Sequence, residues 1–324
     1  MIISRTPLRI SFCGGGTDLK DYWENHEGAV ISTSIDKYVY IIVKKRFDDQ
    51  IWLKYSENEI ADNVNQIRHN IWKACLNKVG IDKGVEIVCL SDIPKGSGLG
   101  GSSAFTISSL NALYALKGIS KSSNELAKEA CEIEIDILKE PIGKQDQYAI
   151  SHGGFNLIEF KKDGNVLLNP IVINHELKKK LSSNLLLFHT GTTREAKEIL
   201  CEQKQNTESR KETLHKMKEF AYLARDALHS SDLRRFGELL HENWEYKKKM
   251  ASNLSNPTID NYYNLAREAG AIGGKICGAG GGGFLLFYVE PEKQDEVRKA
   301  LKELKELTFD FESFGSKIIY IGEK

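Results

Sequence analysis

The feature that most constrains this chain is a glycine-rich segment at residues 94–104, with the sequence PKGSGLGGSSA. It follows an Ile/Val-rich stretch at 85–90 that predicts a strand, and it enters a stretch at 102–116 with helical periodicity. Glycines let a backbone approach a ligand closely, and the free N–H groups at a helix start favour an anion. A tight turn without a ligand is the alternative, but it would not need five consecutive small residues after Leu99. We therefore predict a phosphate-binding loop. Its candidate residues are Lys95, Gly96, Ser97, Gly98, Leu99, Gly100, Gly101, Ser102 and Ser103.

The residues in and around this segment exclude two known types of phosphate-binding loop. A P-loop would need the pattern GxxxxGK[ST], which the sequence does not contain. Gly96, Gly98 and Gly101 match GxGxxG, but a dinucleotide-binding unit requires a second strand that ends in an acidic residue about 20 residues later. Here another candidate helix follows the first one, so the dinucleotide interpretation fails.

One carboxylate on that second candidate helix, residues 125–138, is out of place. The helix start is marked by capping residues at 122–124. On a helical wheel Glu134 falls near the centre of an apolar stripe, where a carboxylate is costly unless it is compensated. The stripe consists of Ala127, Ala130, Cys131, Ile137 and Leu138, and the opposite, solvated side carries Glu129, Glu132 and Asp136. A nucleotide site implies Mg²⁺, which prefers oxygen ligands, so we predict that Glu134 is a metal ligand. A salt bridge to a buried Lys or Arg is the alternative.

Three further segments are candidate parts of the same site. The glycine turn at 14–16 follows the first strand and leads to Asp18, whose carboxylate suits the hydroxyls of a sugar. Asp146 lies just after the Glu134 helix and is either a catalytic base or a helix cap. The glycine cluster at 278–283 precedes a strand rather than a helix, which favours a loop of close backbone approach that lines the cleft.

The composition excludes several classes of protein. The 324 residues include 45 basic and 45 acidic ones, so we expect no nucleic-acid partner. No apolar run approaches the ~18 residues that span a bilayer, and the start MIISR lacks the layout of a signal peptide. We therefore expect a cytoplasmic protein with no membrane partner. The six cysteines show no metal-like spacing, which predicts free thiols.

The order of patterns along the chain predicts two α+β domains with a boundary in 175–195. The expected strands span residues 1–12, 29–47, 85–90, 154–160, 185–189, 284–289 and 317–321. Residues 194–270 are polar and helical, with Pro257 as the only obvious break, and we expect three helices there. A last amphipathic helix is expected near the C-terminus. Its apolar face is formed by Val297, Ala300, Leu301, Leu304 and Leu307.

The sequence resembles the GHMP kinases, the superfamily of galactokinase, homoserine kinase and mevalonate kinase. Three motifs match in order, at 7–18, 94–104 and 275–284. The resemblance implies a two-domain fold with the active site in the cleft between the domains. It implies an N-terminal domain like ribosomal protein S5 domain 2 at 1–185 and a ferredoxin-like C-terminal domain at 186–324.

The resemblance also implies an ATP- and Mg²⁺-dependent transfer of phosphate to a hydroxyl group. By this resemblance, Ser103 and Glu134 take the positions of the family's Mg²⁺ ligands. Asp146 takes the position of the catalytic aspartate. Arg9 stands where mevalonate kinase carries a lysine, and we expect a catalytic role for it. The implied substrate-side residues are Arg9, Gly15, Gly16, Thr17, Asp18, Asp146, Gly280 and Gly281.

Within the superfamily, the strings at 5–19 and 189–194 look like those of D-glycero-D-manno-heptose 7-phosphate kinases. These enzymes phosphorylate the anomeric hydroxyl of the sugar. A substrate that carries a phosphate needs a basic partner, for which Arg194 is a candidate. A fucokinase-like sugar kinase, a decarboxylase of the same superfamily and a non-catalytic sugar or nucleotide sensor are the alternatives. The sequence leaves open whether the protein is a monomer or a homodimer.

Overall fold

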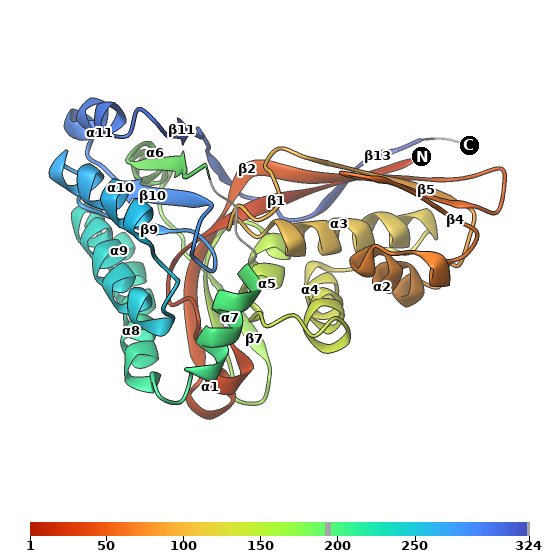
Figure 1. Cartoon of the computed structure of the whole chain (residues 1–324), viewed down its shortest axis with the longest axis horizontal. Coiled ribbons are helices and arrows are strands. Elements are labelled where there is room, and N and C mark those ends of the chain that lie inside the picture. The colour runs from red at the N-terminus through yellow and green to blue at the C-terminus, as the bar shows by residue number, and fades with distance from the viewer. Residues whose placement is uncertain (192–195, 323–324) are drawn as a thin grey trace.

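The computed structural model describes residues 1–191 and 196–322. These residues form two β-sheets with helices packed against them (Figure 1). The larger sheet has the strand order β13-β1-β2-β5-β3-β4, with β6 and β12 paired to β2 and β7 paired to β6. All of its pairs are antiparallel except β3 with β5. Its strands are β1 Ile2–Cys13, β2 Gly28–Lys45, β3 Ile51–Lys54, β4 Asn58–Ala61, β5 Val85–Ser91, β6 Phe155–Phe160, β7 Val166–Pro170, β12 Phe311–Glu312 and β13 Lys317–Ile321.

The long strand β2 holds the larger sheet together because it has two sets of neighbours. Its first part, Gly28–Thr33, pairs with β6, and its second part, Val39–Lys45, pairs with β5. Strand β1 runs beside β2 over nearly its whole length. Alternate residues of β2 such as Ile41 and Val43 are fully buried, as expected for a strand with one face on the core. Residues 6–13 of β1 are all buried, so this end of the strand lies inside the molecule, beside the candidate site.

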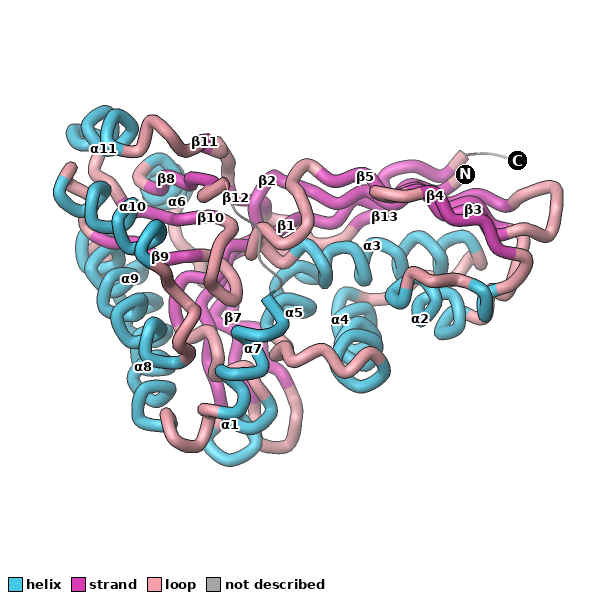
Figure 2. Tube along the Cα trace, viewed as in Figure 1, coloured by secondary structure: helices cyan, strands magenta, loops and turns pink. Residues whose placement is uncertain are grey.

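One face of the larger sheet is covered by helices (Figure 2). The central one, α3, packs on both β1 and β2, and it is flanked by α2, α4 and α5. α3 is buried on nearly all sides, which explains why its sequence contains no charged residue. The helices of this half are α1 Lys20–His26, α2 Asn70–Val79, α3 Gly101–Leu116, α4 Ser123–Cys131 and α5 Gln145–His152.

The smaller sheet has the order β11-β8-β10-β9 and is antiparallel. Helix α9 packs on β9, and α8 packs on α9 and also reaches β1 and β2 of the larger sheet. Apolar side chains of the larger sheet and of α9 meet in this region, since Phe12 of β1 contacts Phe236 of α9. The elements of this half are α6 His175–Ser183, β8 Leu185–His189, α7 Ala196–Gln205, α8 Lys211–His229, α9 Leu233–Lys247, α10 Pro257–Glu268, β9 Gly273–Ile276, β10 Phe284–Tyr288, α11 Gln294–Ala300 and β11 Lys305–Glu306.

Two expectations about the C-terminal half are wrong. The described part of 194–270 contains four long helices rather than three, because the chain turns at 206–210 between α7 and α8. There the Thr207 hydroxyl bonds to the Gln203 carbonyl and the Asn206 amide bonds to Met250, and such side chains compete with helical hydrogen bonds. The amphipathic helix is also shorter than expected. It ends at Ala300 because Lys305 and Glu306 pair with β8 as a strand.

The chain does not keep its two halves wholly separate. After the smaller sheet is complete, β12 and β13 return to the larger one, where they pair with β2 and β1. The Gly322 N–H, just after β13, bonds to the Met1 carbonyl at the start of β1. The domain boundary at 185/186 stays a prediction. In the described part of the chain, no helix is both long and apolar enough to cross a membrane.

Candidate active site

The glycine-rich segment forms a loop between β5 and α3, as predicted. Gly96, Gly98 and Gly100 have φ angles of 78°, 79° and 79°, a region that disfavours other residues. Gly100 precedes α3, and no side chain caps the start of this helix. The first N–H groups of α3 are therefore left for another acceptor, which suits a phosphate.

The glycine cluster at 278–283 packs backbone to backbone on this loop. A Cβ atom on Gly98 would stand 2.4 Å from the Cys277 carbonyl oxygen, and one on Gly283 would stand 2.5 Å from the Ser97 carbonyl oxygen. This is the close approach that the sequence predicts for the cluster. A Cβ atom on Gly280 would instead stand 2.7 Å from the Leu254 carbonyl oxygen, and the Gly281 N–H bonds to that same carbonyl.

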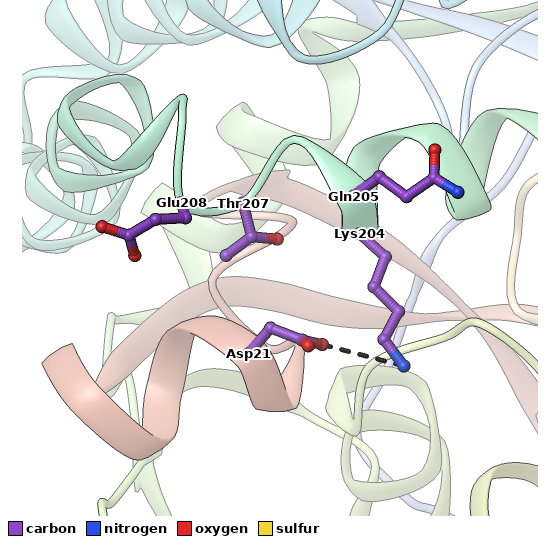
Figure 3. A pocket seen from close by; sticks show the side chains of 5 residues that line it. All are labelled: Asp21, Lys204, Gln205, Thr207 and Glu208. Carbon is purple, nitrogen blue, oxygen red and sulfur yellow. Dashed lines mark ion pairs between the residues drawn. The ribbon is translucent and has the colours of Figure 1, made fainter.

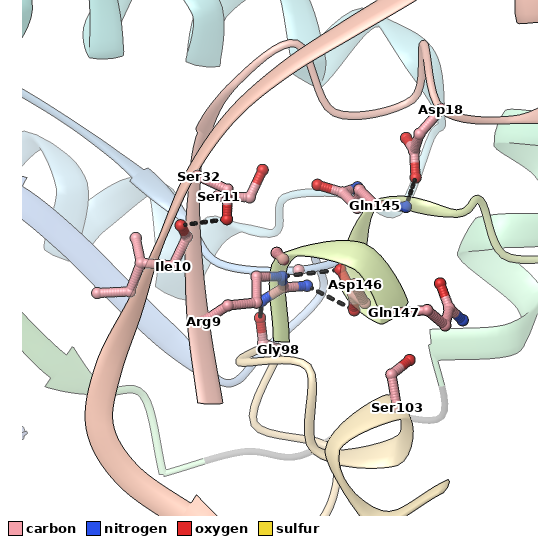
Figure 4. A network of polar contacts seen from close by, with 12 residues as sticks. Arg9, Ile10, Ser11, Asp18, Ser32, Gly98, Ser103, Gln145, Asp146 and Gln147 are labelled. Carbon is pink, nitrogen blue, oxygen red and sulfur yellow. Dashed lines mark hydrogen bonds and ion pairs between the residues drawn. The ribbon is translucent and has the colours of Figure 1, made fainter. Parts of the chain in front are cut away.

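Arg9 and Asp146 form a two-pronged ion pair beside the loop (Figure 4). The Arg9 Nε and Nη2 atoms each donate to one Asp146 carboxylate oxygen at 2.8 Å, and Nη1 donates to the Gly98 carbonyl at 2.8 Å. The Arg9 backbone N–H also bonds to the carbonyl of Leu99. Arg9 comes from β1, is only 3% exposed, and so fixes the carboxylate of α5 against the loop.

Glu134 is buried, as predicted, and lies opposite the start of α3. Its Oε2 accepts hydrogen bonds from Ser103 at 2.8 Å and from Gln147 at 2.6 Å, and its Oε1 accepts one from Ser102 at 2.9 Å. Burial raises the pKa of Glu134, and these three hydrogen bonds oppose the rise. The alternative of a salt bridge is not seen, because no lysine or arginine pairs with Glu134 among the described residues.

The predicted apolar stripe around Glu134 is only partly correct. Ala127, Ala130 and Cys131 are buried, but Ile137 is 51% exposed. Residues 132–137 form a π-helical turn, in which the Leu138 N–H bonds to Ile133 rather than to residue 134. This wider turn shifts the phase of the helix after Glu134, so the wheel of a regular helix misplaces the residues that follow.

Asp18 is buried at the end of the glycine turn. Its Oδ1 accepts from the Gly16 N–H at 2.8 Å, and its Oδ2 accepts from the Gln145 N–H at 3.4 Å. Burial raises the pKa of Asp18, and the Asp146 carboxylate adds to the rise. Thr17 is fully buried and its hydroxyl bonds to the backbone at Gly14 and Ala29, so it shapes the turn.

Two buried lysines lie near these residues, and the sequence analysis missed both. Lys247 donates to the Gly278 carbonyl, and Lys275 donates to the Ser11 carbonyl. Burial and, to a smaller extent, the charge of Lys275 lower the pKa of Lys247 to about 7. Burial also lowers the pKa of Lys275. The wheel argument used for Glu134 would have found Lys247, which shares the buried face of α9 with Leu240 and Trp244.

Two predicted residues, Lys95 and Arg194, remain to be placed. Lys95 is exposed at the tip of the loop, close enough to His69 to lower the pKa of that histidine after the larger effect of burial. Arg194 lies outside the described residues.

Comparison with known proteins supports one family. The family model of the GHMP kinase N-terminal domain matches residues 52–154, and that of the GHMP kinase C-terminal domain matches residues 224–307. The D-glycero-alpha-D-manno-heptose 7-phosphate kinase of Campylobacter jejuni is 33% identical, over 96% of this chain and 96% of that protein. The L-fucokinase/L-fucose-1-P guanylyltransferase of Bacteroides fragilis is 27% identical, over 94% of this chain and 36% of that protein.

Solved structures of related proteins have the same fold over the full length of the chain. The crystal structure of a D-glycero-D-manno-heptose 1-phosphate kinase from Bacteroides thetaiotaomicron superposes with a TM-score of 0.83 at 27% identity and covers 100% of both chains. The two-domain fold expected from the sequence is thereby confirmed. The chain is an ATP-dependent phosphotransferase with a hydroxyl acceptor, and it belongs to the GHMP kinase family.

Proposed function

We propose that this kinase transfers the γ-phosphoryl group of ATP to the anomeric hydroxyl of a heptose 7-phosphate, giving the 1,7-bisphosphate. The observation that carries the proposal is the Arg9–Asp146 ion pair, which lies between the glycine loop at 96–101 and the turn that carries Asp18. A reacting hydroxyl at Asp146 would have the phosphate loop on one side and Asp18 on the other. The identity of the Campylobacter jejuni relative supports the choice of sugar.

In this reaction the acceptor oxygen forms a bond to the γ-phosphorus as the bond between that phosphorus and the β–γ bridging oxygen breaks, and ADP leaves. We assign the triphosphate to residues 95–103 and the start of α3. Asp146 accepts or orients the hydroxyl proton. Arg9 holds both oxygens of Asp146, so it fixes the direction of this carboxylate and steadies the developing negative charge.

The residues around Glu134 fit a magnesium ion. A buried carboxylate with two serine hydroxyls within 3 Å offers only hard oxygen ligands. The described part of the chain contains no group of three or more metal-ligating His, Cys, Asp or Glu side chains. This suits Mg²⁺, which is typically held by one or two protein groups together with phosphate oxygens and water. When bound, the ion supplies charge neutralisation at the β and γ phosphates, and we assign Glu134 and Ser103 as its ligands.

We assign Asp18 to the acceptor's hydroxyl groups. Its carboxylate already holds two backbone N–H groups, which orients it toward the acceptor side of Asp146. Gly15 and Gly16 let the acceptor approach the backbone. Gly280 and Gly281 belong to the supporting loop, and Arg194 stays a candidate partner of the substrate's own phosphate.

The experiment that tests the proposal is Mg²⁺-dependent ADP release from ATP with a panel of acceptors. The panel contains heptose 7-phosphate, heptose 1-phosphate, unphosphorylated heptose, mannose 6-phosphate, fucose, galactose and mevalonate. We expect turnover with heptose 7-phosphate to exceed that with every other compound by at least about tenfold. Preference for heptose 1-phosphate, for fucose or for another free sugar would contradict the 7-phosphate assignment while leaving a sugar kinase. Release of CO₂ from a diphosphorylated acid would contradict the kinase reaction itself.

A further inference from the structure

Gly15 is a glycine whose identity the described contacts do not explain. Its neighbours Gly14 and Gly16 have φ angles of 90° and 102°, and a Cβ on Gly14 would stand 2.0 Å from the Ala29 carbonyl oxygen. Gly15 has no such φ angle. A Cβ at Gly15 would have the Gln145 Nε2 at 3.8 Å and the Ser11 Oγ at 4.0 Å as its nearest neighbours, which are ordinary contact distances. An alanine would therefore fit here, and the space beside Gly15 is left open for another purpose.

Ser11 faces the same space with an unused hydroxyl. The residue is 6% exposed, and its Oγ has no hydrogen-bond partner in the part of the chain that the structure describes. Its cross-strand partner Ser32 is also buried, at 1% exposed, but the Ser32 hydroxyl donates to the Ile10 carbonyl at 3.0 Å. A buried hydroxyl without a partner is costly, so its presence at Ser11 calls for an explanation. The β1–β2 register shifts just after Ser11, a feature that can redirect a side chain.

Gln145 completes the arrangement from the opposite side. Its backbone N–H bonds to Asp18, and its side-chain Oε1 is buried with no partner among the described residues. Figure 4 shows the Ser11 hydroxyl and the Gln145 carboxamide pointing toward one another from β1 and α5. Gln145 is also next to Asp146 in the chain. Two buried polar atoms that lack hydrogen-bond partners among the described residues therefore lie beside Asp146, the residue that we assign to the reacting hydroxyl. They lie next to a glycine at which a Cβ atom would fit.

We propose that Ser11, Gly15 and Gln145 form a subsite that binds a second hydroxyl group of the acceptor, on a carbon close to the reacting one. The inference rests on the proposed sugar kinase function. A neutral hydroxyl suits this place because it can both donate and accept, as the amide and the serine require. An anionic group does not suit it, because such a group only accepts hydrogen bonds and would leave the Gln145 Oε1 without a donor. The acceptor class is thus a polyol or sugar, with any phosphate bound elsewhere.

The chain offers a matched pair of variants to test this subsite. Ser11→Ala removes a hydroxyl with no partner among the described residues, and Ser32→Ala removes a buried hydroxyl that has one. We expect Ser11→Ala to raise the acceptor KM by about 3- to 10-fold, the loss of one neutral hydrogen bond, with unchanged Tm and unchanged KM for ATP. Ser32→Ala should do the reverse, lowering the Tm and leaving the acceptor KM unchanged. If Ser11→Ala lowers the Tm and leaves the acceptor KM alone, its role is structural and the subsite is refuted.

Gly15→Ala and substrate analogues sharpen the test. The added methyl group should keep the Tm and the affinity for Mg·AMPPNP, but raise the acceptor KM by at least about tenfold, because it fills the space of the bound hydroxyl. Among monodeoxy analogues of the best acceptor, one should show the same KM with wild-type protein and with Ser11→Ala, since both partners of that hydrogen bond are then missing. Wild-type KM values in both variants would overturn the subsite and leave the kinase intact. Failure of the wild-type protein to phosphorylate any sugar would instead contradict the proposed function, and the subsite with it.

Discussion

Asp146 and Glu134 are two carboxylates beside one phosphate loop, and they differ in how their negative charges are compensated. Asp146 is partly exposed, and both of its oxygens are paired with the guanidinium of Arg9. Glu134 is fully enclosed and receives hydrogen bonds only from neutral groups. Burial raises the pKa of Glu134, so its charge is poorly compensated within the described chain.

This difference separates positioning from metal binding. A carboxylate held by a two-pronged guanidinium has a fixed direction, which is what a proton acceptor for one hydroxyl needs. A buried carboxylate without a cation is an unfavourable arrangement for a protein alone, and it becomes favourable when a metal ion supplies the missing charge. The following changes test whether the two carboxylates differ in this way.

The largest effect is expected from Asp146→Asn. The amide cannot accept the hydroxyl proton and cannot pair with Arg9 as a carboxylate does, so we expect kcat to fall by about 10²- to 10⁴-fold. Affinity for Mg·AMPPNP, measured by calorimetry, should change little because the phosphate loop is intact. A variant with near-normal kcat would refute the role of Asp146. Asp49→Asn, which alters an exposed ion pair with Lys83 in the turn between β2 and β3, serves as the control.

Glu134→Gln should separate stability from activity. We expect the free protein to gain about 1 kcal/mol in its free energy of unfolding, because an uncompensated buried charge is removed and the shape is kept. Turnover should fall by about 10- to 100-fold, with a higher Mg²⁺ concentration needed for half-maximal rate. Urea unfolding without nucleotide and a magnesium titration of the rate measure the two effects. Lower stability together with an unchanged magnesium dependence would show that Glu134 is a structural residue like any other buried polar group.

Lys247 extends the comparison to a buried cation. Its pKa is lowered to about 7 by burial, so the folded state disfavours the ammonium that the unfolded chain keeps up to pH 10. Between about pH 7 and pH 10 the unfolded state then binds the extra proton, and stability contributed by this residue rises with pH by at most about 1.4 kcal/mol per unit. Below pH 7 both states are charged and the full cost of burial is present.

The measurement is urea unfolding of wild-type protein and Lys247→Met from pH 6 to pH 10. The wild-type curve should gain on that of the variant as the pH rises above 7. Lys275, Cys277, Arg9 and Asp18 influence this lysine and are the same in both proteins, so their contributions largely cancel. Parallel curves would show that Lys247 keeps its proton in the folded state. Lys249→Met, an exposed neighbour, is the control that should produce no such divergence.

Two parts of the site could be predicted from the sequence alone. The glycine loop was predictable because a strand, several glycines and a helix start follow one another in the chain. Glu134 was predictable because a charge in an apolar stripe is visible on a helical wheel. The wheel failed from Ile137 onward because a π-helical turn changes the number of residues per turn, and no residue type marks such a turn.

Contacts between distant segments were beyond the sequence. The pairing of Arg9 with Asp146 joins residues 137 positions apart, and only the resemblance placed them in one site. The free hydroxyl of Ser11 and the bonded hydroxyl of Ser32 look alike in a strand pattern, because the difference depends on the cross-strand register. In the C-terminal half, the break before α8 depends on side-chain hydrogen bonds to a distant loop, which periodicity does not record.

The smallest effect is expected at the Lys204–Asp21 ion pair, which joins α7 to α1 beside a surface pocket of about 350 Å³ (Figure 3). The two side chains link the halves of the molecule, but they are 51% and 45% exposed and 3.8 Å apart. Water screens such a pair, so Lys204→Met should change the free energy of unfolding by less than about 1 kcal/mol and leave kcat unchanged. A cycle with Asp21→Asn should give a coupling energy near zero. Since α1 directly follows the turn that carries Asp18, the KM for phosphorylated and unphosphorylated acceptors should also be compared: a tenfold rise for the phosphorylated one alone would show that this exposed lysine, and not a buried group, receives the substrate's phosphate.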